Sequence, residues 1–88
     1  MTLYGQIASL AASWPKSSID EHGLPNHRPL REIRYHGGRG QRVYFFVQDG
    51  GLWVTGAGPK GSKKVQNRNI EAAYKRMQLL MTWLNSQR

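Results

Sequence analysis

The sequence predicts an α+β fold: an N-terminal helix, a three-stranded antiparallel β-meander, and a C-terminal helix packed on one face of the sheet. Three observations predict it. Apolar residues recur at helical spacing near both ends of the chain. Between them lie three segments rich in alternating apolar residues, and glycine-rich turns separate these segments. A chain of 88 residues has the length of one domain, so residues 1–88 are expected to fold as a single unit.

The first helix is predicted over residues 3–14, where an apolar residue returns every three or four positions. Pro15 ends it, because proline lacks the amide hydrogen that a continuing helix needs. Residues 15–29 are rich in proline and polar residues and are predicted to form a loop. A loop of this length in a small domain is often functional.

The three predicted strands cover residues 30–36, 41–48 and 52–57. The middle strand has the strongest pattern, because it is rich in β-branched and aromatic residues. Alternation places Arg42 and Tyr44 on one of its faces and Val43 on the other. We expect the helices to cover the Val43 face, so that Arg42 and Tyr44 lie on the open face.

A tight hairpin turn is predicted at residues 49–51 and a basic loop at residues 58–66. The second helix is predicted over about residues 67–86, with Asn67 as its N-cap and Glu71 in its first turn, where the helix dipole favours an acid. Its apolar stripe consists of Ile70, Ala73, Tyr74, Met77, Leu80, Met81 and Leu84.

The net charge of +8 is concentrated in the C-terminal two thirds of the chain. Residues 28–88 carry twelve Lys and Arg against three acidic residues, whereas residues 1–27 carry one Lys against two. A basic field of this kind attracts phosphate chains, which favours nucleic acid or a ribonucleoprotein as partner. An acidic protein partner, or a basic surface with no specific partner, would account for the same charge.

Several functional classes are disfavoured by the composition. The chain has no cysteine for a disulfide or a thiolate metal site, and no apolar run long enough to span a membrane. Its first residues lack a basic leader, so a cytoplasmic location is expected. His22, His27 and His36 do not form a metal motif with Asp or Glu, and no nucleophile elbow or nucleotide-binding glycine loop is present. We therefore expect no metal and no small-molecule cofactor.

The basic and aromatic residues of the sheet suggest chemistry on RNA. Cleavage without a metal requires a group that takes the 2′-hydroxyl proton, a cation that neutralises the phosphorane, and an acid for the leaving 5′-oxygen. The candidate catalytic residues are Arg42, Tyr44 and His36. The candidate RNA- or phosphate-binding residues are Arg31, Arg34, Arg39, Lys60, Lys63 and Lys64. Phosphate binding without chemistry would use the same residues, and the spacing alone does not separate the two.

The order of short motifs over residues 28–78 resembles the core of the RelE/ParE toxin superfamily, particularly its HigB-like and addiction-module-killer proteins. That family has a strand of the form L-x-E-[IL]-R, then a glycine turn, a strand that begins R-V, a K-K segment and a C-terminal helix. The matching residues here are Leu30, Glu32, Ile33 and Arg34, then Arg42, Val43 and Tyr44, then Lys63 and Lys64, then Ile70, Glu71 and Ala72 or Ala73.

The resemblance implies the toxin of a type II toxin–antitoxin pair, held inactive by a cognate antitoxin protein. Toxins of this kind include ribosome-dependent mRNA endonucleases, so the ribosome and mRNA are expected partners. Arg34, Arg42, Lys63 and Lys64 match basic positions of the family pattern. Family members usually begin with an additional strand and a fuller helical hairpin, so this chain is expected to be shortened at its N-terminus.

Two alternatives follow from the same residues. One is a toxin of the ParE kind, which binds gyrase and cuts no nucleic acid itself. The other is a non-enzymatic phage or bacterial inhibitor that binds a protein partner through its basic sheet.

Overall fold

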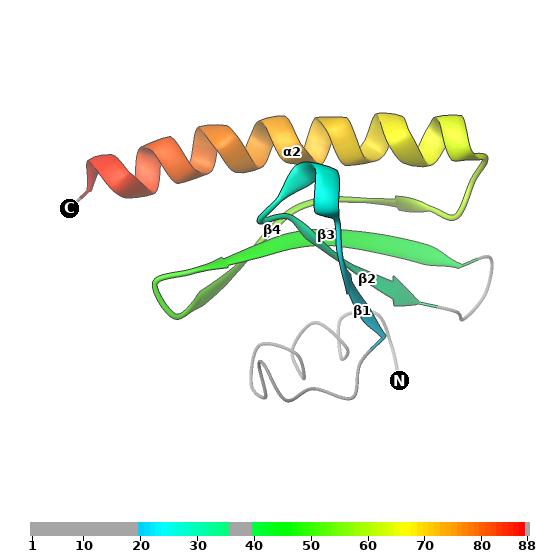
Figure 1. The fold of residues 1–88 in the computed structure, drawn as a ribbon, viewed down its shortest axis with the longest axis horizontal. Coiled ribbons are helices and arrows are strands. Elements are labelled where there is room, and N and C mark those ends of the chain that lie inside the picture. The colour runs from blue at the N-terminus through cyan, green and yellow to red at the C-terminus, as the bar shows by residue number, and fades with distance from the viewer. Residues whose placement is uncertain (1–19, 36–39, 88) are drawn as a thin grey trace.

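The described part of the chain is an antiparallel four-stranded sheet with one long helix across one face (Figure 1). A computed structural model describes residues 20–35 and 40–87. The elements are, in chain order, β1 (Glu21–Gly23), a 3₁₀ turn η1 (Pro25–His27), β2 (Arg31–Tyr35), β3 (Gln41–Gln48), β4 (Gly51–Pro59) and α2 (Lys63–Ser86). The strands lie side by side in the order β1-β2-β3-β4.

The predicted α+β class, the antiparallel meander and the C-terminal helix are confirmed, but the sheet has four strands rather than three. The additional strand, β1, lies in the segment predicted as a loop. Three residues are too few to show a β pattern in sequence, and pairing with β2 creates the strand: Glu21 lies opposite Ile33, and the Arg34 amide donates to the Asp20 carbonyl at 2.9 Å. The helix predicted over residues 3–14 lies outside the described residues.

The hairpin between β3 and β4 turns at Asp49 and Gly50, as predicted. Both residues have positive φ, 54° and 75°, which is the backbone that matches a two-residue turn to the twist of its strands. A register shift opposite Tyr44 and Phe45 adds one residue to β4, so Thr55 has no cross-strand partner. Beyond this bulge Gly56 pairs with Tyr44, and β4 continues to Pro59.

The helix covers the face of β3 that was predicted to be open. Tyr44 and Phe46 are fully buried and pack with Ala73 and Met77 of α2. Val43, with Ile33 and Phe45, forms a second buried cluster that faces away from α2. The prediction that Arg42 and Tyr44 lie on an open face is therefore wrong. Alternation separated the two sets of side chains correctly, but both faces of β3 are apolar and alternation does not say which one a helix covers.

Two glycines of β4 let α2 lie close to the sheet. A Cβ at Gly56 would lie 2.9 Å from the Cβ of Ala73, and a Cβ at Gly58 would lie 2.3 Å from Asn69 Nδ2. Both positions pair with residues of β3 that face the helix. The glycines thus serve as places of close backbone approach rather than as turns.

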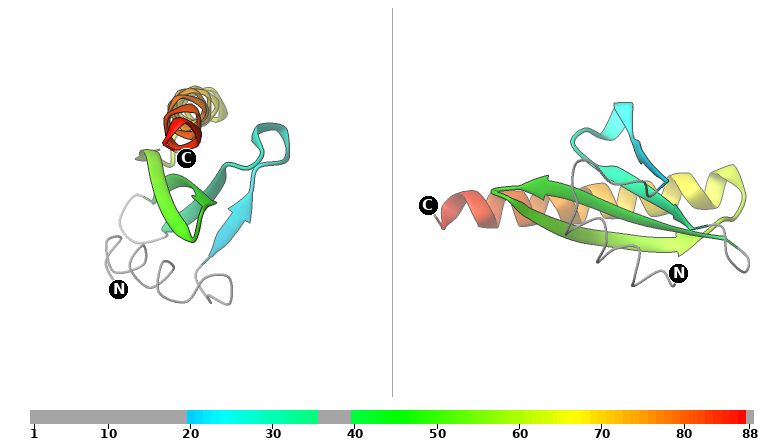
Figure 2. Two further views of the ribbon diagram at one scale, coloured as in Figure 1. Left: turned by 90° about the vertical axis from the view of Figure 1, so that its left-hand side faces the viewer. Right: turned by 90° about the horizontal axis from the view of Figure 1, so that it is seen from below.

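The helix begins four residues before the predicted start. Ser62 is the N-cap, with an extended backbone and a side-chain oxygen that accepts from the Val65 amide at 3.2 Å, so the assignment of Asn67 as N-cap is wrong. Glu71 therefore lies beyond the first turn, where it contacts His27 of η1. The His27 ring also meets the Tyr74 ring edge-on, with centroids 5.2 Å apart, so η1 is attached to the helix side of the sheet (Figure 2).

None of the described helical segments has the length and hydropathy of a membrane span.

We predict that Gly56→Ala lowers the free energy of unfolding by about 1–3 kcal/mol, because the added methyl group overlaps Ala73 and neither atom can move without shifting backbone. Urea unfolding measures the change. In a double-mutant cycle, Ala73→Gly should recover part of the loss, since it removes the overlapping atom. Gly58→Ala is the matched comparison and should cost less, because the end of the Asn69 side chain can rotate away. Full additivity in the cycle would contradict close contact between these two positions.

Candidate nucleic-acid interface

Basic residues from β2, β3, the β4–α2 connection and the first turn of α2 meet at one end of the sheet. Arg34 and Arg42 are direct cross-strand neighbours on β2 and β3, and Arg42 pairs in turn with Gly58 of β4. The Lys60 amide donates to the Gly40 carbonyl at 3.2 Å, which ties the end of β4 to the start of β3. The helix starts at this same end (Figure 1). We call the set Arg34, Arg42, Lys60, Lys63 and Lys64 the basic end.

Glu32 is the acidic partner at the basic end. Its side chain is buried, 5% exposed as a residue, and its Oε1 accepts from Arg34 Nε at 2.8 Å. The two residues are two apart on β2, so they share the face that α2 covers. This ion pair fixes the guanidinium of Arg34 while leaving it partly exposed.

Arg42 is the cross-strand neighbour of Arg34 and lies beside this ion pair. The residue is 9% exposed, and its Nε is buried with no hydrogen-bond acceptor among the described residues. Glu32 supplies one negative charge against the two guanidiniums of Arg34 and Arg42. A buried cation with unsatisfied donors is costly, and an anion or a water molecule is needed to complete its hydrogen bonds.

Tyr44 lies at the back of this cluster, under the helix. Its residue is 0% exposed, and its hydroxyl has no hydrogen-bond partner within the described ranges. Burial raises the pKa of Tyr44 above its ordinary 10.0, and the nearby Glu32 charge raises it further, while Arg42 opposes the shift. The hydroxyl therefore keeps its proton at neutral pH. In this position Tyr44 is suited to donate a hydrogen bond and not to act as a base.

The lysines of the basic end are exposed and gather at the start of α2. Lys63 and Lys64 are in its first turn, where the structure has no acidic residue, and Lys60 precedes the Ser62 cap. The sequence predicted these lysines in a loop. The free amide groups of a first helical turn attract anions, and lysines among them strengthen the attraction.

Arg31, another predicted site residue, does not belong to the basic end. Arg31 points to the opposite face of β2 and binds the Glu21 carboxylate through Nε. His36 and Arg39 lie outside the described residues. Sequence reasoning missed Glu32 as the partner of Arg34, although their spacing on one strand carried that information.

Comparisons with protein-family models, with curated proteins and with solved structures found no match. Within residues 20–35 and 40–87, no three His, Asp or Glu side chains are grouped so that they could hold a metal ion.

We predict that Tyr44→Phe keeps the free energy of unfolding or raises it by up to about 1 kcal/mol, because the substitution removes a buried hydroxyl that has no partner and preserves the packed ring. Urea unfolding of both proteins is the measurement. A loss of stability larger than about 1 kcal/mol would mean that the hydroxyl makes a hydrogen bond.

We also predict a loss of stability at high pH that depends on Tyr44. Its pKa is higher in the folded protein than in the unfolded chain, so its contribution is complete below pH 10.0 and is lost as the pH rises through the folded pKa. Urea unfolding from roughly pH 9 to roughly pH 11 should show a smaller decrease for Tyr44→Phe, since the other titrating groups are common to both proteins. Parallel decreases would show that Tyr44 ionises equally easily in both states.

Proposed function

We propose that this chain is the toxin of a type II toxin–antitoxin pair with a RelE/ParE-like fold, and that it cuts mRNA on the ribosome and so blocks translation. The order of motifs along residues 28–78 supports the family. The antiparallel meander with a C-terminal helix is compatible with it. The basic end supplies a cationic surface suited to the RNA backbone.

The observation that carries the proposal is the buried Nε of Arg42, which lies beside Arg34 and has no hydrogen-bond acceptor among the described residues. Glu32 binds Arg34, and among the described residues no carboxylate forms an ion pair with the adjacent Arg42, so one positive charge is left for an incoming anion. A phosphate of the RNA backbone has the charge and the acceptor oxygens to complete this arrangement. Lys63 and Lys64 then bind neighbouring phosphates from the first turn of α2.

The chemical roles divide between binding and proton transfer. Arg42 and Arg34 stabilise the charge that develops on the phosphorane. Tyr44 is protonated and fully buried, so it does not take the 2′-hydroxyl proton. His36 remains the predicted residue for proton transfer, because an imidazole titrates close to neutral pH.

We predict that expression of the chain in bacteria arrests growth and produces new mRNA 5′ ends only while ribosomes are translating. Arg42→Ala should lower the cleavage rate by about 10²–10³-fold, the usual effect of removing one donor that stabilises an oxyanion. Mapping of 5′ ends and growth curves measure both effects, and circular dichroism checks that the variant folds.

A second pair of variants avoids the buried positions. The double substitution Lys63→Ala with Lys64→Ala should relieve growth arrest, whereas Lys75→Ala, an exposed lysine farther along α2, should not. Equal toxicity of these variants would contradict RNA binding at the basic end. Double-strand DNA breaks with intact mRNA would point instead to gyrase as the target.

A non-enzymatic binder of a protein partner is the second candidate. Two observations favour it: Tyr44 is buried away from any substrate, and Leu79 and Trp83 stand one helical turn apart on α2 while 73% and 55% exposed. Exposed apolar pairs of this kind are typical of docking surfaces. A stable one-to-one complex with one cellular protein, together with unchanged mRNA 5′ ends, would favour this candidate over the endonuclease.

A further inference from the structure

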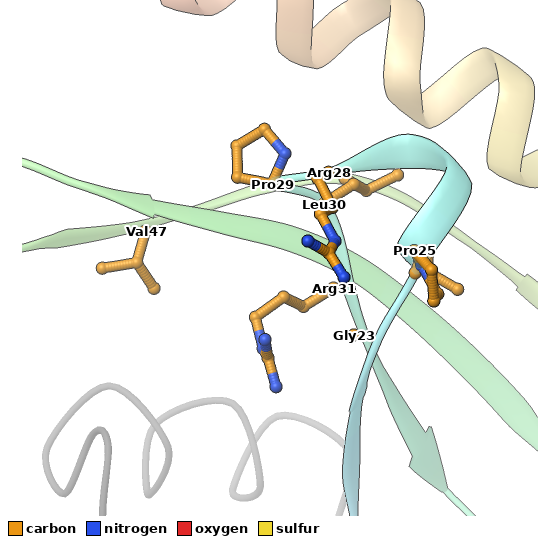
Figure 3. Close-up of a pocket in the computed structure, with 8 residues that line it drawn as sticks. Gly23, Pro25, Arg28, Pro29, Leu30, Arg31 and Val47 are labelled. Carbon is orange, nitrogen blue, oxygen red and sulfur yellow. The ribbon is translucent and has the colours of Figure 1, made fainter.

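A second arginine-lined site lies at the other end of β2. Here an open cavity of about 620 Å³ is formed between η1, the start of β2 and the end of β3 (Figure 3). Two arginines, Arg28 and Arg31, line it, and Leu24, Pro25 and Val47 supply apolar walls. Its volume falls in the range of ordinary ligand sites.

The position of Arg31 is fixed by β1. Its Nε donates to the Glu21 carboxylate across the β1–β2 pair, and its guanidinium lies over Gly23, the residue opposite it in the register. A Cβ at Gly23 would come within 3.3 Å of the Arg31 Nη1. The missing side chain of Gly23 therefore leaves the room that the Arg31 guanidinium occupies.

Arg28 supplies the charge that is left over. It lies in the connection between η1 and β2, its residue is exposed, and no described residue forms an ion pair or hydrogen bond with its side chain. The Glu21 carboxylate balances Arg31, so the cavity as described has one net positive charge. Arg28 and Arg31 both reach into the opening in Figure 3.

We infer that this cavity binds a peptide segment of a partner protein in which a carboxylate side chain stands next to an apolar one. The guanidiniums recognise the carboxylate, since arginine matches a carboxylate in charge and geometry. The walls of Leu24, Pro25 and Val47 take up the apolar neighbour. An RNA backbone suits the cavity less well, because a phosphate chain has no aliphatic group for these walls. The inference does not depend on the proposed activity at the basic end.

The test is an NMR titration of the isotope-labelled full chain with the probe peptide acetyl-leucyl-glutamyl-leucinamide. We expect saturable shifts of the Gly23, Leu24 and Val47 amides. The matched peptide with glutamine in place of glutamate should bind at least about tenfold more weakly, because it lacks the charge that the guanidiniums recognise. Inorganic phosphate and a short RNA serve as competing probes.

Two variants and one control complete the design. Arg28→Gln should weaken binding of the glutamyl peptide about tenfold, Arg28→Lys should weaken it less, and Lys75→Gln, which removes an equal charge elsewhere on the surface, should leave it unchanged. The amide spectrum of each variant shows directly whether it is folded. Equal binding of both peptides, equal shifts with phosphate or RNA, shifts confined to the basic end, or unchanged binding by Arg28→Gln would each overturn the inference.

Discussion

The close contact between α2 and the glycines of β4 is the constraint on which the rest of the described structure depends. Gly56 and Gly58 leave no side chain between β4 and the helix, so Ala73 and Asn69 come within contact distance of the strand. This approach brings Ala73 and Met77 down onto Tyr44. A larger residue on β4 would lift the helix and open the space beneath it, because packed interiors tolerate little added volume.

The same contact gives the basic end its unusual electrostatics. Because the helix lies close, Glu32 and Arg42 lose most of their exposure to water although both are charged. Water no longer screens their charges, so each group affects its neighbours more strongly than it would on an open sheet. The raised pKa of Tyr44 is one result, and the unsatisfied Nε of Arg42 is another. An anion that reaches this cluster meets a fixed, poorly solvated cation.

The sequence contained enough information for the class of fold and for which side chains of the middle strand share a face. Alternation correctly put Arg42 and Tyr44 on one face, and the apolar stripe with Ala73 and Met77 correctly marked the buried side of α2. The covered face was not predictable, because it depends on the bulge at Thr55, which changes the phase of β4 and turns its glycines toward the helix. A one-residue shift of this kind leaves no periodic signal.

The start of the helix was missed for an electrostatic reason. Both Ser62 and Asn67 are good N-cap residues, but Ser62 is followed by two lysines, which a helix N-terminus ordinarily disfavours. The unfavourable charge therefore hid the true start. A protein that keeps lysines in the first turn accepts a small loss of helix stability, and the same two charges make that turn a stronger site for anions.

One strand, β2, relates the two arginine-lined sites. Arg31 and Arg34 are three residues apart, and an odd separation on a strand sends them to opposite faces. Each is held by a glutamate, Glu21 for Arg31 and Glu32 for Arg34. Each also lies near a second arginine that no described carboxylate binds. The chain thus repeats one arrangement at both ends of β2: an arginine held by a glutamate lies near an arginine that no described carboxylate binds.

The residues around Arg42 and around Arg28 differ, and the two sites therefore favour different ligands. At the basic end the available arginine, Arg42, is buried among charged neighbours and close to the lysines of α2, which favours a polyanion with several phosphates. At the other end the available arginine, Arg28, is exposed above walls formed by Leu24 and Val47, which favours a single carboxylate attached to an apolar group. Because the two sites use opposite faces of β2, an RNA at one and a peptide at the other need not compete for the same surface.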